Sequence, residues 1–475
     1  MGYRPVPVLH IIHGIPPFSQ TAMCQTAMPR LLRHLAPAVA LLSLAAATSS
    51  AVRAQGAKTA APKPSPYAAE LERRVGVVMP KVIAWRRDIH EHPELSGEEV
   101  RTAKLVAEAL TAMGIEVRTN VGGHGVVGLL KGGKPGPVVA LRADMDGLPV
   151  EEQTDLPFKS KAKGTYRGAP VGIMHACGHD SHVAMLLGAA EVLAGMKAQL
   201  AGTVKFIFQP AEEGLPNGGG GAELMIKDGV LENPKVDAVF GLHVGPGPLG
   251  ELKVRPGPVM AASNSFTLIV RGKQSHGAQP WNGVDPIVVG SQIVMGLQTI
   301  VSRQIDNSQL PAIITVGAFQ GGVRSNIIPD SVVMLGSIRT FDMNVRREIF
   351  KRVAQTAQQI AAASGGSARV VIDSGYLVTR NDSSLTMRMM PTLQWAAGDT
   401  KLAVPGLWTA SEDFSFFQDR VPGVYFNLGV TPKSQDWRTV PVNHSPLFFV
   451  DEGALPTGVK AMAGLAVDYL AAVRK

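Results

Sequence analysis

The sequence predicts an α/β protein in which a main domain, with a largely parallel sheet flanked by helices, is interrupted by an inserted ferredoxin-like α+β domain. Two observations predict this fold. Apolar runs typical of strands alternate with helical apolar spacing along most of the chain, and the order changes to strand, helix, strand, strand, helix, strand within 260–375. The chain has 475 residues, 45% of them hydrophobic, which is enough for more than one domain with its own core.

The composition excludes several other classes of protein. Charged residues make up 18% and aromatic residues 5%, and the 51 Gly and 34 Pro follow no period, so collagen-like and coiled-coil architectures do not fit. The formal net charge is +8, but residues 1–54 hold four arginines and no acidic residue, so the remainder carries only +4. Because its charges of both signs are mixed along the chain, we expect no nucleic-acid partner.

Residues 1–54 are typical of an export signal. After Met28 a cationic start precedes a mostly apolar run at 35–47, and 52–54 offer small residues at the cleavage positions. Met28 is an alternative initiator. An uncleaved membrane anchor is the alternative interpretation, but the polar residues at 48–50 shorten the run below the roughly 20 apolar residues that a span needs. We therefore expect export to the periplasm or the medium, with no membrane attachment after cleavage.

The first part of the main domain is predicted at 67–259. It follows an Ala- and Pro-rich segment at 55–66, which is typical of a linker. Helical apolar spacing extends from Tyr67 to about residue 112, and 114–117 turns toward a strand. Further apolar patterns predict strands at 126–130, 138–141, 204–208 and 236–242 and a helix at 183–196.

The inserted domain is predicted at 260–375. Its patterns predict a strand at 266–270, a helix at 287–301, strands at 312–318 and 332–338, a helix at 346–363 and a strand at 369–372. This βαββαβ order is the ferredoxin-like arrangement. Helices and strands alternate again after that point, so 376–475 are expected to return to the main domain.

Cys177 is the only cysteine outside the predicted signal, so the mature chain has no intrachain disulfide. It stands in the segment HACGHD directly before a predicted helix. Cys177 and His179 are separated by one glycine and can face the same point, and a thiolate and an imidazole suit Zn, Mn, Co or Ni. A helix-capping turn with a core cysteine is an equally good explanation of these residues alone.

Other polar residues follow the ends of later apolar strands. Glu212 and Glu213 are adjacent, so one carboxylate can bind a metal while the other acts as a general base on water. A solvated charged loop is the alternative. His243 ends the next strand, and His444 lies in a polar loop far along the chain. Ligands of open α/β sheets bind at strand ends, where these side chains are expected to converge.

Eight segments, in this order along the chain, resemble the aminoacylase/carboxypeptidase family of metal-dependent amidohydrolases. The resemblance is strongest to the branch of hippurate hydrolases and indoleacetyl-amino acid hydrolases, and it extends from about Tyr67 to the C-terminus. The segments are RADMDGLP (142–149), HACGHD (175–180), QPAEEG (209–214), GLHV (241–244), GKQSHGAQP (272–280), SNIIPD (325–330), SEDF (411–414) and NHSP (443–446).

The resemblance implies a catalytic main domain with two divalent metal ions, either Mn, Zn, Ni or Co. Glu212 is implied to be the general base, which takes a proton from the attacking water and returns it to the leaving amine. We expect Asp144 or Asp146 to orient a ligand histidine, and His175 to help shape the site. The implied metal ligands are Cys177, His179, Glu213, His243 and His444.

The resemblance also assigns roles to the inserted domain, as a lid and as the contact of a homodimer. It implies that His276 reaches a site across the dimer and stabilises the oxyanion of the tetrahedral intermediate. Asn326 is implied to contact the substrate. Arg339 is implied to bind the substrate's free carboxylate through two parallel hydrogen bonds, although a surface strand residue is the alternative for Arg339.

Together these features predict an exported metal-dependent amidohydrolase that cleaves small-molecule N-acyl or N-aroyl amino acids, such as hippurate, to a carboxylic acid and an amino acid. A dipeptidase or carboxypeptidase on the same scaffold and a non-catalytic periplasmic binding protein are the alternatives. Glu212 argues against a binding protein, which needs no base. The sequence contains neither G-x-S-x-G nor H-E-x-x-H, so serine-hydrolase and zincin signatures are missing.

Overall fold

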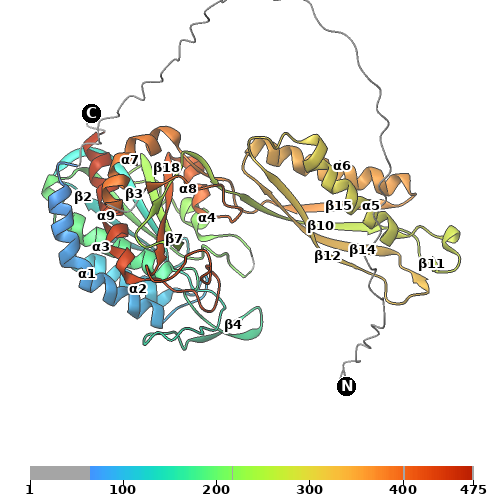
Figure 1. The fold of residues 1–475 in the computed structure, drawn as a ribbon, viewed down its shortest axis with the longest axis horizontal. Helices are drawn as coiled ribbons and strands as arrows, with labels where there is room; N and C mark the ends of the chain where they lie inside the picture. The colour runs from blue at the N-terminus through green and yellow to red at the C-terminus, as the bar shows by residue number, and fades with distance from the viewer. Residues whose placement is uncertain (1–64, 217, 399–401, 473–475) are drawn as a thin grey trace, which may run out of the picture. The chain divides into compact units, whose positions relative to one another are not determined.

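Residues 65–216, 218–398 and 402–472 are described by the structure, a computed structural model (Figure 1). The predicted export signal, 1–54, lies outside these residues, as does the linker up to residue 64. Within the described part of the chain, no helix is both long and apolar enough to cross a membrane.

The main domain is built on an eight-stranded sheet with the order β1-β2-β6-β3-β7-β18-β8-β17. The neighbours β6, β3, β7 and β18 run parallel, whereas β2 is antiparallel to β6 and β8 is antiparallel to β18. The predicted α/β fold is therefore confirmed, with antiparallel pairs toward both edges. The strands are β1 (Glu116–Val121), β2 (Gly125–Lys131), β3 (Lys134–Asp144), β6 (Ala201–Gln209), β7 (Ala238–Pro248), β8 (Leu252–Lys253), β17 (Leu402–Ala403) and β18 (Gly423–Thr431).

Helices cover this sheet, and the most buried of them is α3 (His179–Ala194), which packs against α1 and α9. The helical stretch predicted from Tyr67 to residue 112 is two helices, because Pro93 disfavours a helical conformation at His92, where α1 ends. The other helices are α1 (Ala68–Glu91), α2 (Val100–Ala112), α4 (Gly221–Lys227), α7 (Ser383–Ala397), α8 (Phe414–Arg420) and α9 (Leu455–Ala472).

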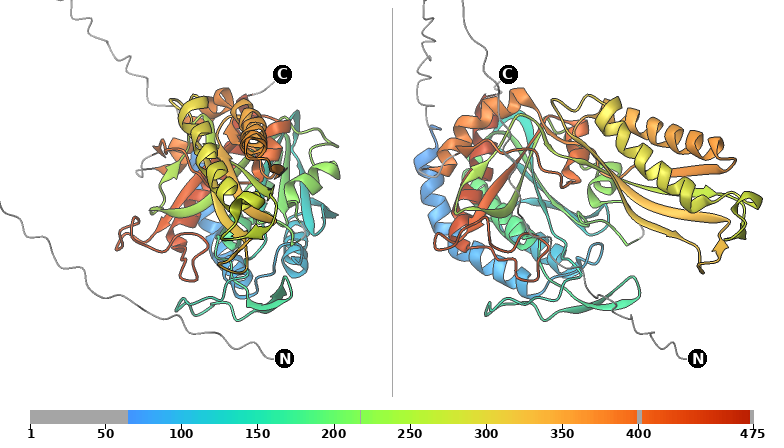
Figure 2. Two further views of the ribbon diagram at one scale, coloured as in Figure 1. Left: turned by 90° about the vertical axis from the view of Figure 1, so that its right-hand side faces the viewer. Right: turned by 45° about the vertical axis from the view of Figure 1, so that its right-hand side comes forward.

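The inserted domain is a four-stranded antiparallel sheet with the order β12-β14-β10-β15. Helices α5 and α6 lie together on one face of it (Figures 1 and 2) and enclose a core separate from that of the main domain. This is the predicted ferredoxin-like βαββαβ arrangement. Its elements are β10 (Ala262–Arg271), α5 (Pro286–Thr299), β12 (Ala312–Gly321), β14 (Ser331–Thr340), α6 (Met343–Ala363) and β15 (Ser367–Asp373).

The two connections between these domains run side by side. On the way into the insertion the chain forms β9 (Gly257–Met260), and on the way out it forms β16 (Thr379–Asn381), which pairs antiparallel with β9. The sequence did not predict these short strands. It also missed a hairpin of the main domain, β4 (Lys163–Tyr166) and β5 (Ala169–Gly172), and a small ladder of the inserted domain, β11 (Ser275–His276) with β13 (Ile327–Ile328).

Candidate metal centre and active site

The turn before α3 presents Cys177 and His179 to the same side. Gly178 caps the helix with φ 88°, a left-handed conformation that glycine adopts without strain. A Cβ atom at this position would lie 2.4 Å from Cγ2 of Val244. The glycine between the two donors is therefore needed both for its conformation and for the close approach of β7.

Glu212 and Glu213 lie on a tight turn directly after β6. The turn begins at Ala211, whose φ of 50° is unusual for a residue with a side chain. Carboxylates hold it in place, because the amide of Ala211 donates to Oε1 of Glu99 at 2.8 Å, and the amides of Glu212 and Glu213 donate to Asp146 at 3.1 and 3.0 Å. Such an over-determined, strained turn is typical of a functional site.

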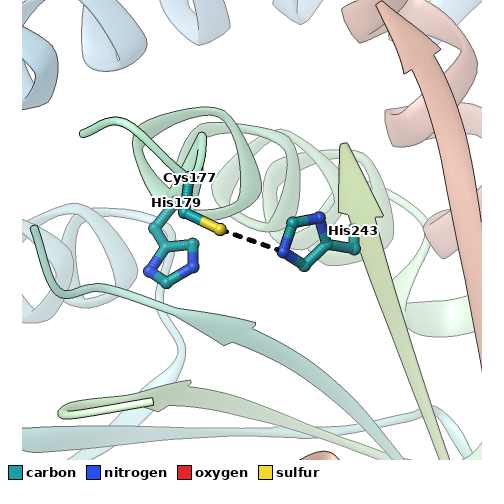
Figure 3. Close-up of side chains that lie close together, drawn as sticks. All are labelled: Cys177, His179 and His243. Carbon is teal, nitrogen blue, oxygen red and sulfur yellow. Dashed lines mark hydrogen bonds between the residues drawn. The ribbon is translucent and has the colours of Figure 1, made fainter. Parts of the chain in front are cut away.

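The predicted ligand positions come together at this turn. The donor atoms of Cys177, His179 and His243 lie within 4.8 Å of one another, and Figure 3 shows the three side chains facing each other. Cys177 Sγ is 3.3 Å from His243 Nε2. Cys177 also belongs to a second group with Glu213 and His444, in which His444 Nε2 lies 3.0 Å from Glu213 Oε1.

These two groups form one cluster, because His179 is also grouped with Glu212 and Glu213. We name the six residues the donor cluster: Cys177, His179, Glu212, Glu213, His243 and His444. The structure thus brings all five predicted ligand positions and the predicted base together, while their roles in metal binding and catalysis stay predictions.

A divalent metal fits the donor cluster by the chemistry of its atoms. Thiolate, imidazole and carboxylate are ligands of first-row transition metals. His179 Nε2 is buried and has no hydrogen-bond partner among the described residues, and its nearest carboxylate oxygens, on Asp144 and Glu212, are 3.9 and 4.0 Å away. The other ring nitrogen, Nδ1, faces the backbone oxygen of Asp146 at 2.9 Å. One imidazole nitrogen held by an oxygen and the other left free is the arrangement of metal-binding histidines.

The electrostatics of the donor cluster also favour a cation. Burial, together with the charges of Glu412 and Glu213, raises the pKa of Glu212 well above its usual range. Burial and the neighbouring carboxylates likewise raise the pKa of the Cys177 thiol. Burial alone would lower the pKa of His179, but Asp144 and Asp146 raise it to about 10. Several acidic groups therefore share one buried space, and a divalent cation would offset the negative charge that they acquire on losing their protons.

Two aspartates of β3 and its following residues support the cluster in different ways. Asp146 accepts four hydrogen bonds, from Ser96 Oγ at 2.7 Å, from the two amides of the turn, and from His179 Nδ1, which lies 3.2 Å away. Asp144 instead lies 2.5 Å from His182 Nδ1 and accepts from Arg142 at 2.6 Å. Asp146 is thus the aspartate that contacts His179 directly through a hydrogen bond.

A hollow of about 380 Å³ adjoins the donor cluster. Its only arginine among the described residues is Arg339, on β14 of the inserted domain, and the guanidinium Nη1 donates to Ser411 Oγ at 3.1 Å. Tyr376 lines the same hollow, and its hydroxyl donates to the backbone oxygen of Glu212 at 2.5 Å. The full lining is Glu212, Glu213, Ser263, Arg339, Gly375, Tyr376, Ala410, Ser411 and His444.

The three remaining predicted site residues do not line the hollow. His276 and Asn326 are exposed neighbours in the β11–β13 region, where the amide of Gly277 donates to the backbone oxygen of Asn326 at 2.9 Å, and neither lines the hollow. His175 is buried, and its two ring nitrogens have no hydrogen-bond partner among the described residues. Burial lowers the pKa of His175 to about 4.

Sequence reasoning missed five residues of the hollow, and two of them, Ser411 and Tyr376, are hydrogen-bonded to a predicted site residue. Ser411 belongs to the SEDF segment, so that motif carried a signal, but the serine was not singled out. Tyr376 follows β15 in a segment without a motif, and nothing in the sequence indicated that its hydroxyl reaches Glu212. Both were missed because their partners lie 72 and 164 residues away along the chain.

Comparisons with known proteins agree with this geometry. The model of peptidase family M20/M25/M40 matches residues 140–468. Thermostable carboxypeptidase 1 of Saccharolobus solfataricus is 44% identical over 82% of this chain and 95% of its own length. The IAA-amino acid hydrolase ILR1-like 4 of Arabidopsis thaliana is 40% identical over 82% and 86%. The crystal structure of a dinuclear metal-binding M20 peptidase from Bacillus subtilis, 34% identical, covers 83% of this chain and 99% of that one with a TM-score of 0.69.

Proposed function

The chain belongs to peptidase family M20/M25/M40 and is a metal-dependent amidohydrolase, and from this premise we propose that it hydrolyses N-acyl amino acids, with hippurate-like compounds as the reference substrates. The observation that carries the proposal is the hollow, in which Glu212 and the other carboxylate of the turn lie at one part of the wall and Arg339 at another. A substrate with an amide bond and a nearby free carboxylate matches both groups. The relatives' names, carboxypeptidase and IAA-amino acid hydrolase, support an amino acid as the leaving group.

Five residues of the donor cluster would hold two divalent metal ions, as the resemblance implies. When bound, such ions supply Lewis acidity, which lowers the pKa of water and polarises a carbonyl group. The residues in this role are Cys177, His179, Glu213, His243 and His444.

Glu212 moves the proton in the proposed reaction. Its carboxylate takes a proton from the water that attacks the amide carbon, and returns that proton to the nitrogen of the leaving amine. The turn that carries Glu212 is fixed by Asp146 and by the Tyr376 hydroxyl, so the carboxylate is positioned before substrate binds.

Arg339 orients the substrate in this proposal. A guanidinium matches a carboxylate with two parallel hydrogen bonds, and Arg339 forms no ion pair with a carboxylate of the described residues. The donors that face the hollow are therefore available to the α-carboxylate of an N-acyl amino acid.

We also propose that two copies of the chain pair through their inserted domains and that His276 acts in the site of the partner subunit. In its own chain His276 is exposed and does not line the hollow, which is compatible with that role. There it would donate to the oxyanion of the tetrahedral intermediate. Export by the segment 1–54 is a further part of the proposal.

One experiment tests the proposed function directly. Protein purified without added metal is analysed for metal content, and its hydrolysis of N-benzoyl, N-acetyl and other N-acyl amino acids is measured before and after chelation. We expect about two metal ions per chain and release of the free amino acid that chelation abolishes. Metal-loaded protein that cleaves unblocked dipeptides but no N-acyl amino acid would instead identify a dipeptidase.

A further inference from the structure

Arg339 differs from the buried arginines of the main domain in lacking an acidic partner. Arg86 is paired with Asp180, and Arg142 with Asp144. Arg339 is half-buried in the hollow, and the one hydrogen bond of its side chain among the described residues joins Nη1 to Ser411 Oγ at 3.1 Å. The guanidinium is therefore fixed by a neutral group, which leaves its charge uncompensated and available to an anion.

Ser411 and Arg339 come from different domains. Ser411 lies in the segment directly before α8, and Arg339 lies on β14 of the inserted domain, opposite Ser263 of β10 in the sheet register. Because residues directly opposite each other share one face of a sheet, Ser263 flanks the guanidinium on its own sheet, while Ser411 reaches it from the main domain. Both hydroxyls line the hollow together with Arg339.

From this arrangement we infer that Ser411 is a positioning and specificity-determining residue, which sets the Arg339 guanidinium to select substrates with a free carboxylate next to the amide. This inference rests on the proposed function and deepens it. An acidic residue at 411 would neutralise Arg339, and an apolar one would leave the guanidinium free to rotate. A hydroxyl does neither, since it accepts one hydrogen bond and leaves the other N–H donors free.

The inference is tested by binding, separately from turnover. The probe is 3-benzoylpropionate, in which a CH2 group replaces the N–H of N-benzoylglycine so that no amide can be cleaved, and its carboxamide serves as the uncharged counterpart. Calorimetry on metal-loaded Ser411→Ala should show the dissociation constant of the acid raised about tenfold and that of the carboxamide changed by less than about twofold. Equal weakening of both probes, or of neither, would overturn the inference.

Matched variants separate positioning from a general effect on folding. Ser337→Ala removes a hydroxyl from the same strand as Arg339, outside the hollow, and should leave both dissociation constants unchanged. Ser411→Thr keeps the hydroxyl and should restore the preference for the acid. In an Arg339→Ala background, adding Ser411→Ala should raise the dissociation constant of the acid by less than about a further twofold, because the effects of coupled residues are not additive. If Ser411→Ala weakened binding of the acid in that background as much as it does in the wild-type protein, Ser411 would not act through Arg339.

Failure of this inference is distinguishable from failure of the proposed function. Protein that hydrolyses no N-acyl amino acid, but whose tighter binding of the acid than of the carboxamide is lost in Ser411→Ala, would refute the proposed reaction and uphold the role of Ser411. Protein that hydrolyses N-acyl amino acids and their carboxamides equally well, with no preference in binding, would refute the role of Ser411.

Discussion

The donor cluster and the carboxylate-selecting side of the hollow are held in opposite ways. Asp146 alone ties together Ser96, His179 and the amides of Glu212 and Glu213, and all of these contacts are formed within one domain. Among the described residues, the side chain of Arg339 has one hydrogen bond, to a hydroxyl of the other domain. In the proposed function, the reacting groups would thus be fixed before substrate arrives, whereas the selecting group would keep its donors for the substrate.

The comparison separates two kinds of residue. Preorganised groups that act on the reacting bond lose most of their effect when displaced slightly, so they are supported by several buried contacts. Groups that recognise the rest of the substrate need free hydrogen-bonding capacity. Changes in the donor cluster should therefore affect turnover or metal content most, and changes on the selecting side should affect the choice of substrate.

The largest expected effect is that of Glu212→Gln. Glutamine keeps the shape of the side chain but cannot accept the proton, so kcat should fall about 10³-fold, within the range of general acid–base catalysis. Metal content, measured by elemental analysis, should stay at the wild-type value. The neighbouring Glu213→Gln is the matched variant and should lose metal. Normal turnover of Glu212→Gln at full metal loading would show that another group is the base.

His276→Ala tests whether the proposed reacting groups are complete within one chain. Loss of an oxyanion donor should lower kcat about 10²-fold, with metal content unchanged. Mixing this variant with Glu212→Gln under conditions that exchange subunits should restore part of the activity, because one of the two sites in a mixed dimer then has both groups intact. His124→Ala is the control, and a mixture no more active than its components would exclude a role across the dimer.

Asp146→Asn should weaken metal binding about 10- to 100-fold, as expected for a group that orients a metal-binding histidine through a hydrogen bond. The asparagine side chain keeps the volume of the carboxylate but loses its charge. Its N–H groups would face the backbone amides of Glu212 and Glu213, which need an acceptor. Competition with a fluorescent chelator measures the affinity. Asp237→Asn, at a carboxylate that accepts from the amide of Val138, is the control and should bind metal normally. If both variants bound metal with the same affinity, a residue other than Asp146 would orient His179.

The same contrast explains what could be predicted from the sequence. The resemblance to the amidohydrolase family implied that Cys177 and His444 belong to the metal site, while the βαββαβ insertion and the meeting of Glu213 and His243 followed from apolar periodicity and from the rule that parallel strands end at one edge. The Arg339–Ser411 contact did not, since it depends on how two domains meet, which no local pattern encodes. The break between α1 and α2 was also missed, although Pro93 marked it.

The smallest expected effect is that of Tyr376→Phe, at a contact that joins the two sides of the comparison. Tyr376 follows the inserted domain, its backbone oxygen accepts from Ser263, and its hydroxyl donates to the backbone oxygen of Glu212. Removing the hydroxyl leaves the ring in place and deletes one hydrogen bond to the turn. We expect kcat to fall about three- to tenfold, as for the loss of a single neutral hydrogen bond, with KM changed less than about twofold.

A fall in kcat alone would mean that Tyr376 belongs with the preorganised groups, although the chain reaches it only after leaving the inserted domain. A rise in KM with kcat unchanged would place it with the selecting groups, since a uniform loss of binding leaves the chemical step untouched. Tyr166→Phe, in the hairpin strand β4, is the control for the loss of a tyrosine hydroxyl as such. Wild-type values of both constants in Tyr376→Phe would mean that Asp146 and Glu99 suffice to hold the turn.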